Sequence, residues 1–155
     1  YYTFIFPYLI YCIEVWGSAS LVHINKLLKV QKRLCRVIAS CEHRTPSMPL
    51  FKSLRILTIY DVHSFSVAVF MHRFSTNMLP NIFNSFCFQL NSDNSFIITR
   101  QNNDLRLPFF RLSISQKTMK YKGVVLWNNL PNFITSVPSV SLFKKKLKCF
   151  YLDKY

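Results

Sequence analysis

The protein has 155 residues, and its 20 Lys and Arg against 6 Asp and Glu give a formal net charge of +14. Half of the residues are hydrophobic and 16% are aromatic, which excludes a disordered basic tail and suits one domain, or one domain with an extension. The charge favours a polyanionic partner, either nucleic acid or an anionic membrane surface.

The chain opens with an apolar run from Tyr1 to Ile13. We interpret the sequence as a fragment, because it starts inside this run and without Met. No basic region precedes the run, so a signal peptide is not expected. The run is shorter than the roughly 17–25 residues of a membrane helix, and membrane association is an alternative that rests on this run alone. A short helix is predicted over 7–16, and Gly17 to Ser20 should end it.

Residues 21–40 give the clearest helical pattern, with Ser20 as a plausible N-cap. One side of this helix is apolar and consists of Ile24, Leu27, Leu34, Cys35 and Ile38. The opposite side is basic and carries Lys26, Lys29, Arg33 and Arg36. Gln31 falls within the apolar side, so we expect its amide to bond a loop carbonyl or a backbone amide.

The middle of the chain continues with helical patterns. A short helix is predicted over 50–57, and Asp61 should cap the next helix over 62–75. That helix is apolar nearly all round, which predicts a central place in a core or on a partner. A short aromatic turn or helix over 82–88 follows.

The second part of the chain mixes patterns. The polar interval 89–103 predicts a flexible loop or linker. Segments 105–107 and 111–114 have β character and could pair as strands. A compact piece follows Gly123 over 124–130, and Ser139 or Ser141 should cap a last helix to Tyr151. We therefore predict a mainly α fold, with a helical bundle over 1–88, the polar interval over 89–103, and a small α+β module over 104–155.

No catalytic set is evident. The acids are too few for a two-metal site, and the chain has only two glycines, Gly17 and Gly123, so a Gly-rich phosphate loop is absent. The cysteines lack a Cys-x-x-Cys pair and predict free thiols. Cys41 and His43 have no second ligand pair for zinc, and no cofactor is expected. His23, His63 and His72 are interpreted as packed or surface residues.

Polyanion binding is the activity that the composition supports best. Basic residues cluster over 26–55 and 100–148. Their contacts with phosphates would be independent of sequence and sensitive to salt. Aromatic residues in the second cluster could stack on unpaired bases, although we expect each to lie in the core: Phe109, Phe110, Tyr121 and Trp127.

The order of several short motifs is informative where each alone is not. From Pro7 to about Lys148 these motifs are Pro-Tyr-Leu-Ile-Tyr-Cys at 7–12, Val-Trp-Gly at 15–17, Leu-Lys-Val-Gln-Lys-Arg at 28–33, Pro-Leu-Phe at 49–51, Leu-Trp-Asn-Asn-Leu-Pro at 126–131 and Phe-Lys-Lys-Lys-Leu at 143–147. This order resembles the C-terminal region, including or extending the thumb, of non-LTR (LINE-type) retrotransposon reverse transcriptases.

The resemblance implies a non-catalytic fragment, because the catalytic aromatic-Ala-Asp-Asp motif of that family is absent and no catalytic or metal-binding residue is carried over. The parent would be an RNA-directed DNA polymerase in an intracellular ribonucleoprotein, nuclear and cytoplasmic. The fragment would hold RNA or an RNA/DNA hybrid beside the parent chain's palm, with no small-molecule substrate. The expected phosphate contacts are Lys26, Lys29, Arg33 and Arg36, with Arg100, Lys144, Lys145, Lys146 and Lys148 as further candidates.

Two other interpretations stay open. In the first, the region is a scaffold that packs on the palm and contacts nucleic acid little. In the second, it is a membrane-associated basic protein. In the leading interpretation, we expect Trp127 to anchor the C-terminal half and Asn128 to tie a turn.

Overall fold

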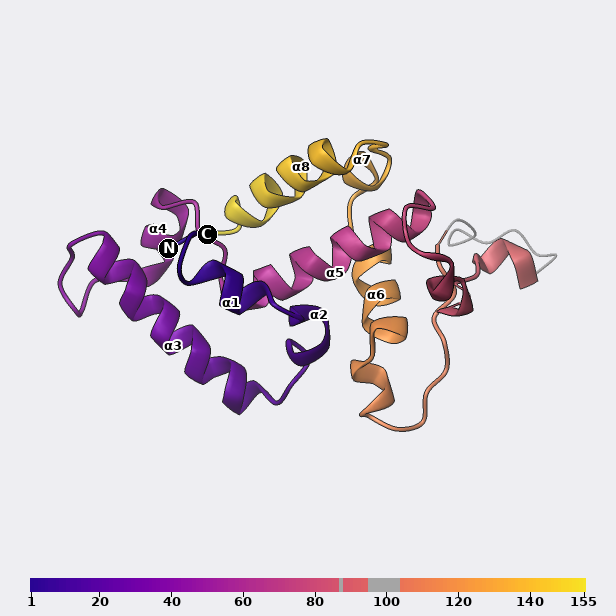
Figure 1. Ribbon diagram of the computed structural model, residues 1–155, viewed down its shortest axis with the longest axis horizontal. Helices are drawn as coiled ribbons and strands as arrows, with labels where there is room; N and C mark the ends of the chain where they lie inside the picture. Colours follow the sequence, from indigo (N-terminus) through magenta and orange to yellow (C-terminus); the bar gives the residue numbers. More distant parts are fainter. Residues whose placement is uncertain (87, 95–103) are drawn as a thin grey trace. The chain divides into compact units, whose positions relative to one another are not determined.

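The computed structural model of the protein describes residues 1–86, 88–94 and 104–155. Helices make up 61% and strands 1% of the structure, which confirms the predicted mainly α class. The described α-helices, labelled in Figure 1, are α1 (Phe6–Ile10), α2 (Ile13–Trp16), α3 (Leu21–Ile38), α4 (Ser47–Ser53), α5 (Ile59–Ser75), α6 (Met119–Asn128), α7 (Asn132–Thr135) and α8 (Val140–Leu152). Three 3₁₀ helices complete them: η1 (Asn81–Phe86), η2 (Asn91–Asn94) and η3 (Ser115–Lys117).

The chain forms two compact units. Unit 1 comprises residues 1–66 and 144–155, and unit 2 comprises residues 67–143. These boundaries fall within α5 and α8, so they differ from the predicted boundaries at 88 and 104. Most of the predicted linker, 95–103, lies outside the described residues.

The first helical segment is broken where the sequence predicted a continuous helix over 7–16. Cys12 adopts φ 50°, in the left-handed region, and separates α1 from α2. A residue with a Cβ cannot continue a right-handed helix through that conformation. The prediction of one helix here is therefore wrong.

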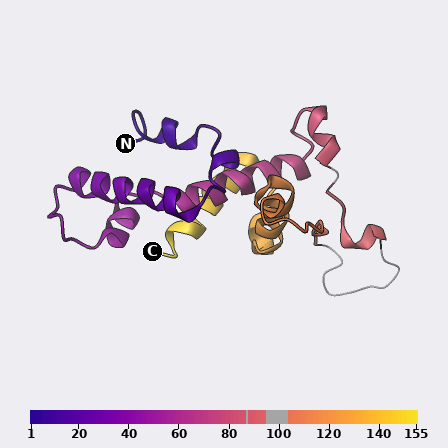
Figure 2. The same ribbon diagram turned by 90° about the horizontal axis from the view of Figure 1, so that it is seen from below.

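Helices α3 and α4 lie side by side in both views of unit 1 (Figures 1 and 2). Cys35, Phe51 and Ile56 form a buried cluster between α3, α4 and the segment after α4. The predicted helix over 50–57 is displaced toward the N-terminus, because α4 ends at Ser53.

The ends of α3, α4 and α5 share one geometry. Ser40, Arg55 and Asn77 each follow the helix with φ near 50°. After each, a backbone N–H reaches back five residues, as from Ile56 to the carbonyl oxygen of Phe51 at 2.9 Å. This is the Schellman arrangement, which satisfies the last carbonyls of a helix and normally uses glycine at the left-handed position. With only two glycines in the chain, residues that carry side chains occupy it.

Helix α5 begins at Ile59, three residues earlier than predicted. Thr58 Oγ1 accepts a hydrogen bond from the Asp61 N–H at 3.3 Å, so Thr58 is the capping residue and the prediction for Asp61 is wrong. Most of the α5 side chains are buried, and this confirms the expected central place of the helix in the core.

Unit 2 is built around the second half of α5. Gly123 of α6 is buried, and a Cβ there would lie 2.8 Å from the Met71 sulfur, so a larger residue would force the Met71 side chain to move. His72 is buried, stacks on Phe143 with 4.2 Å between ring centroids, and its Nε2 donates to the Val137 carbonyl oxygen at 2.6 Å. Its packed role agrees with the prediction for this histidine.

The predicted strand pair within 105–114 does not form. Leu105 makes only an isolated antiparallel bridge with Leu90, and the rest of the segment is irregular. Two causes are evident: Pro108 has no N–H for a ladder, and the Asn128 side chain binds both polar backbone groups of Leu105. The side-chain amide thus takes the place of a partner strand.

Candidate nucleic-acid interface

Helix α3 presents its basic residues because its opposite side is fixed in unit 1. Ile24, Gln31 and Cys35 are buried along one side of the helix, as the pattern predicts. At the edges of the predicted apolar side, Leu27 and Ile38 are exposed, so the buried stripe is narrower than expected. The orientation of the helix is therefore set by three inward side chains.

Gln31 makes buried hydrogen bonds that help to hold α3 in place. Its Nε2 donates to the Leu57 carbonyl oxygen at 2.8 Å and to the Tyr1 hydroxyl at 2.9 Å. Its Oε1 accepts from the Ile59 N–H at 2.9 Å. The prediction that this amide bonds a loop carbonyl or a backbone amide is confirmed for both. The contact links α3 to the first turn of α5.

Three of the four predicted cations on α3 project into solvent. Lys26, Lys29 and Arg33 are exposed, and within the described residues none of their side chains has a hydrogen bond or an ion pair. They span about 10 Å of the helix axis, which corresponds to roughly three phosphates of one duplex strand. The helix backbone thus holds three available charges at fixed spacing.

Arg36, the fourth predicted cation, is only half-buried but is already engaged. Its Nε donates to the Thr45 carbonyl oxygen at 2.9 Å and so fastens the loop that follows α3. A guanidinium group has further N–H donors, but this one is oriented by a structural contact. We therefore separate Arg36 from the three available cations, which we call the α3 cation row: Lys26, Lys29 and Arg33.

Aliphatic side chains surround the α3 cation row, and the exposed His23 imidazole lies at the edge of the same face. Val22, Val30 and Val37 are exposed and alternate with the cations along α3. Such a face can offer charge to phosphates and methyl groups to sugars, but α3 contains no Phe, Tyr or Trp ring on which a base could stack.

The lysines of α8 are not equivalent to one another. Lys145 and Lys146 are exposed, and Lys144 is half-buried. The Nζ atom of Lys148 donates to the Tyr2 hydroxyl at 3.1 Å and lies 5.0 Å from the centroid of the Tyr2 ring. Lys148 also lines an apolar cavity of about 190 Å³ together with Tyr1, Tyr2, Phe6, Leu57, Val62 and Phe65. Its side chain therefore completes the packing of unit 1.

Arg100 lies outside the described residues, so its predicted role has no structural counterpart. The predicted basic set is thus divided. The structure brings Lys26, Lys29 and Arg33 together on one face, leaves Lys145 and Lys146 exposed on another helix, and assigns Arg36 and Lys148 to internal contacts.

The Asp61 carboxylate is engaged by hydroxyl groups inside unit 1. Asp61 accepts hydrogen bonds from the Thr58 and Tyr155 hydroxyls through the same Oδ2 atom. Burial, followed by the hydrogen bond to Asp61, raises the pKa of Tyr155. Burial also raises the pKa of Tyr1 and of Tyr151 to about 12 each. These hydroxyls stay protonated, so Asp61 serves the interior and not the basic surface.

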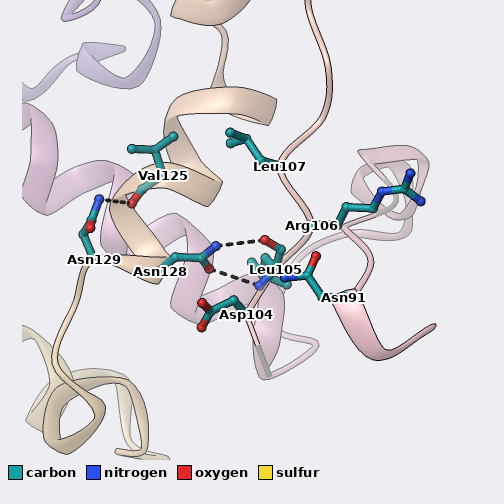
Figure 3. Close-up of a pocket in the computed structure, with 8 residues that line it drawn as sticks. All are labelled: Asn91, Asp104, Leu105, Arg106, Leu107, Val125, Asn128 and Asn129. Atoms are coloured by element: carbon teal, nitrogen blue, oxygen red, sulfur yellow. Dashed lines mark hydrogen bonds between the residues drawn. The ribbon is translucent and has the colours of Figure 1, made fainter. Parts of the chain in front are cut away.

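In unit 2, an open pocket of about 510 Å³ lies beside α6 (Figure 3). Asn128 Nδ2 donates to the Leu105 carbonyl oxygen at 2.8 Å, and Asn128 Oδ1 accepts from the Leu105 N–H at 3.1 Å. The sequence predicted that Asn128 ties a turn, and it ties an irregular segment instead. Asn129 bonds back to the Val125 carbonyl oxygen, and the Arg106 guanidinium points away from Asn128.

The aromatic residues of the second basic cluster divide into two groups. Phe110, Tyr121 and Trp127 are half-buried, in partial agreement with the prediction of core positions. Phe109 is 93% exposed, so the prediction that it lies in the core is wrong. No sequence pattern would have separated it from Phe110, because the two are adjacent in an irregular segment.

Metal binding and membrane insertion are two further possibilities for the described residues. Cys12, Cys35, Cys41 and Cys149 are free, and no group of three or more His, Cys, Asp or Glu residues is placed to hold a metal ion within that part of the chain. None of the helices described is both long and apolar enough to cross a membrane. Comparisons of the chain with protein-family models, with curated proteins and with solved structures found no match.

Proposed function

We propose that the protein is a non-catalytic, nucleic-acid-binding part of a retrotransposon reverse transcriptase, and that the α3 cation row contacts the phosphate backbone of template RNA or of the primer–template duplex. The reverse-transcriptase assignment rests on the order of the sequence motifs. The binding assignment rests on one structural observation: three exposed cations without internal partners share one face of a helix fixed by Gln31.

Charge is the physical reason for this assignment. The protein carries a net charge of +14, and Lys–phosphate and Arg–phosphate contacts release counterions when they form. This mode needs no base recognition, which agrees with the aliphatic surroundings of the row. Lys145 and Lys146 of α8 are secondary contacts in this proposal, because they are exposed but lack the fixed row of α3.

The test is a binding titration of the full chain against a short RNA hairpin. The variant K26A/K29A/R33A should bind much more weakly than the wild type. The variant K26R/K29R/R33K keeps all three charges and should bind almost normally. A second control, R44A/R73A, removes exposed charges elsewhere and should weaken binding less per charge removed.

A scaffold role in the parent enzyme is the alternative, and exposed apolar side chains favour it. Phe4, Tyr8, Tyr11 and Val15 are all largely exposed along the first helical segment. If the wild type is folded by circular dichroism but does not bind the hairpin at low salt, the scaffold function replaces nucleic-acid binding.

A further inference from the structure

The segment 106–114 of unit 2 presents an aromatic ring to solvent between two arginines. Phe109 is 93% exposed, and the side chains of Arg106 and Arg111 are exposed on either side of it in the sequence. A large apolar side chain in this position loses the stabilisation that burial would provide. Among the large hydrophobic side chains that the structure describes, Phe109 is the most exposed.

The segment is fastened at both ends. At Leu105, the Asn128 side chain binds the backbone N–H and carbonyl oxygen. At Phe110, the backbone carbonyl oxygen accepts from Gln116 Nε2 at 3.0 Å, and the ring contacts Tyr121 of α6 with 6.4 Å between centroids. Only a few residues separate the contacts at Leu105 and Phe110, so the backbone that carries Phe109 is fixed on both sides.

After Asp104, the charged side chains of unit 2 are all basic in the sequence. No Asp or Glu occurs between Asp104 and Asp153, while Arg106, Arg111, Lys117, Lys120 and Lys122 all fall between Leu105 and Phe143. Burial, and then repulsion from Lys117, lowers the pKa of Lys122, so these two positive charges lie close together. Such a surface attracts a polyanion and repels a positively charged partner.

We infer that Phe109, flanked by Arg106 and Arg111, is a stacking site for an unpaired base of single-stranded nucleic acid. The inference rests on the proposed nucleic-acid binding and adds a second, chemically different contact to it. A base offers the Phe109 ring a flat partner, and the two guanidinium groups reach the adjoining phosphates. The segment also exposes Leu107, Leu112 and Ile114, but the two arginines beside Phe109 favour a polyanionic partner over a purely apolar one.

The test uses a single-stranded RNA of about ten nucleotides, within the range of about 4–16 nucleotides that a small single-strand-binding domain covers. Phe109→Ala should weaken binding about 5- to 150-fold, the equivalent of removing one stacked base. Phe109→Trp should restore it, whereas Phe109→Leu, which keeps an apolar side chain without a ring, should not. Because the side chain is exposed, these variants should unfold at the temperature of the wild type.

Phe133 supplies the matched control. It lies in α7 of the same unit, is 61% exposed, and has no Lys or Arg within ten residues on either side. Phe133→Ala should leave single-strand binding unchanged. An RNA of the same length with its bases removed should bind the wild type and Phe109→Ala equally, because only phosphate contacts are then left to measure.

Three results would overturn the inference: Phe109→Ala binds like the wild type, Phe109→Leu binds like Phe109→Trp, or the weaker binding of Phe109→Ala persists with the base-free RNA. The last two would point to an apolar contact, as with a protein partner. The two proposals fail separately. If K26A/K29A/R33A does not bind the hairpin while Phe109→Ala binds the single-stranded RNA like the wild type, only the proposed stacking site is wrong. If the reverse holds, the role of α3 fails alone.

Discussion

Helices α3 and α8 carry similar basic sequences but use them differently. On α3, the three members of the cation row extend into solvent, and the helix is held from its opposite side by Gln31. On α8, Lys148 is bound to Tyr2 and covers an apolar cavity, while Lys145 and Lys146 stay exposed. A basic side chain is therefore available to a ligand only where the fold gives it no hydrogen bond or packing contact inside the protein.

The largest effect should come from breaking the support of α3. Gln31→Leu leaves the Leu57 carbonyl oxygen and the Ile59 N–H buried without this partner, at a cost of roughly 1–3 kcal/mol for each group. The free energy of unfolding in urea should fall accordingly. Arg33→Leu, on the exposed side of the same helix, is the control and should change stability little. A Gln31→Leu protein as stable as the wild type would mean that α3 is held by its apolar contacts alone.

The next prediction compares the contributions of α3 and α8 to RNA binding. K26A/K29A removes two charges from α3, and K145A/K146A removes two exposed charges from α8. We expect the α3 variant to bind the RNA hairpin more weakly than the α8 variant does, because its cations belong to a row on one fixed face. Equal affinities in fluorescence anisotropy titrations would show that the protein binds through its net charge and not through a particular helix.

A smaller effect should separate Lys148 from its neighbours. Lys148→Met keeps much of the apolar stem but removes the hydrogen bond to Tyr2 and the cation–π contact, which is worth about 0.5–1 kcal/mol at an exposed site. Thermal unfolding should occur at a slightly lower temperature, with RNA affinity unchanged. A lower affinity with unchanged stability would return Lys148 to the set of phosphate contacts.

Alkaline pH should lower the free energy of unfolding through tyrosines that contact α3 or lie in α8, and stability near neutral pH should not change through these groups. Burial raises the pKa of Tyr1, which bonds Gln31 of α3, and of Tyr151 in α8 from 10.0 to about 12. The unfolded chain therefore loses these protons first, so this contribution to stability is complete below pH 10 and disappears as the pH rises to about 12. Stability measured in urea at several pH values checks this, with Tyr1→Phe as the variant that should lose less. A flat profile across this window would contradict the burial of both hydroxyls.

Some of the fold followed from the sequence because local chemistry decided it. The amide of Gln31 sits in an apolar stripe and had to find polar partners, and those partners are a carbonyl and an N–H as expected. The apolar circumference of α5 likewise required a central place in the core. In both cases the spacing of the residues along the helix was enough to predict the outcome.

Other features depended on contacts that spacing does not reveal. Arg36 was assigned to phosphates, but the loop after α3 brings the Thr45 carbonyl oxygen to it. Phe109 was assigned to the core, but the Asn128 and Gln116 contacts hold its segment at the surface. The break at Cys12 has no glycine or proline to mark it. Each of these outcomes is set by tertiary structure, which overrides the local pattern.

Contact between the α3 cation row and phosphates is best tested by the salt dependence of hairpin binding by the wild type and by K26A/K29A/R33A. If the α3 cation row contacts phosphates, the logarithm of the wild-type affinity falls steeply with the logarithm of salt concentration. The variant's slope should then be smaller by about 0.7–0.9 for each phosphate that its side chains no longer neutralise. If the folded variant keeps the wild-type slope and affinity, the row is a solvated helix face and the account of α3 is wrong.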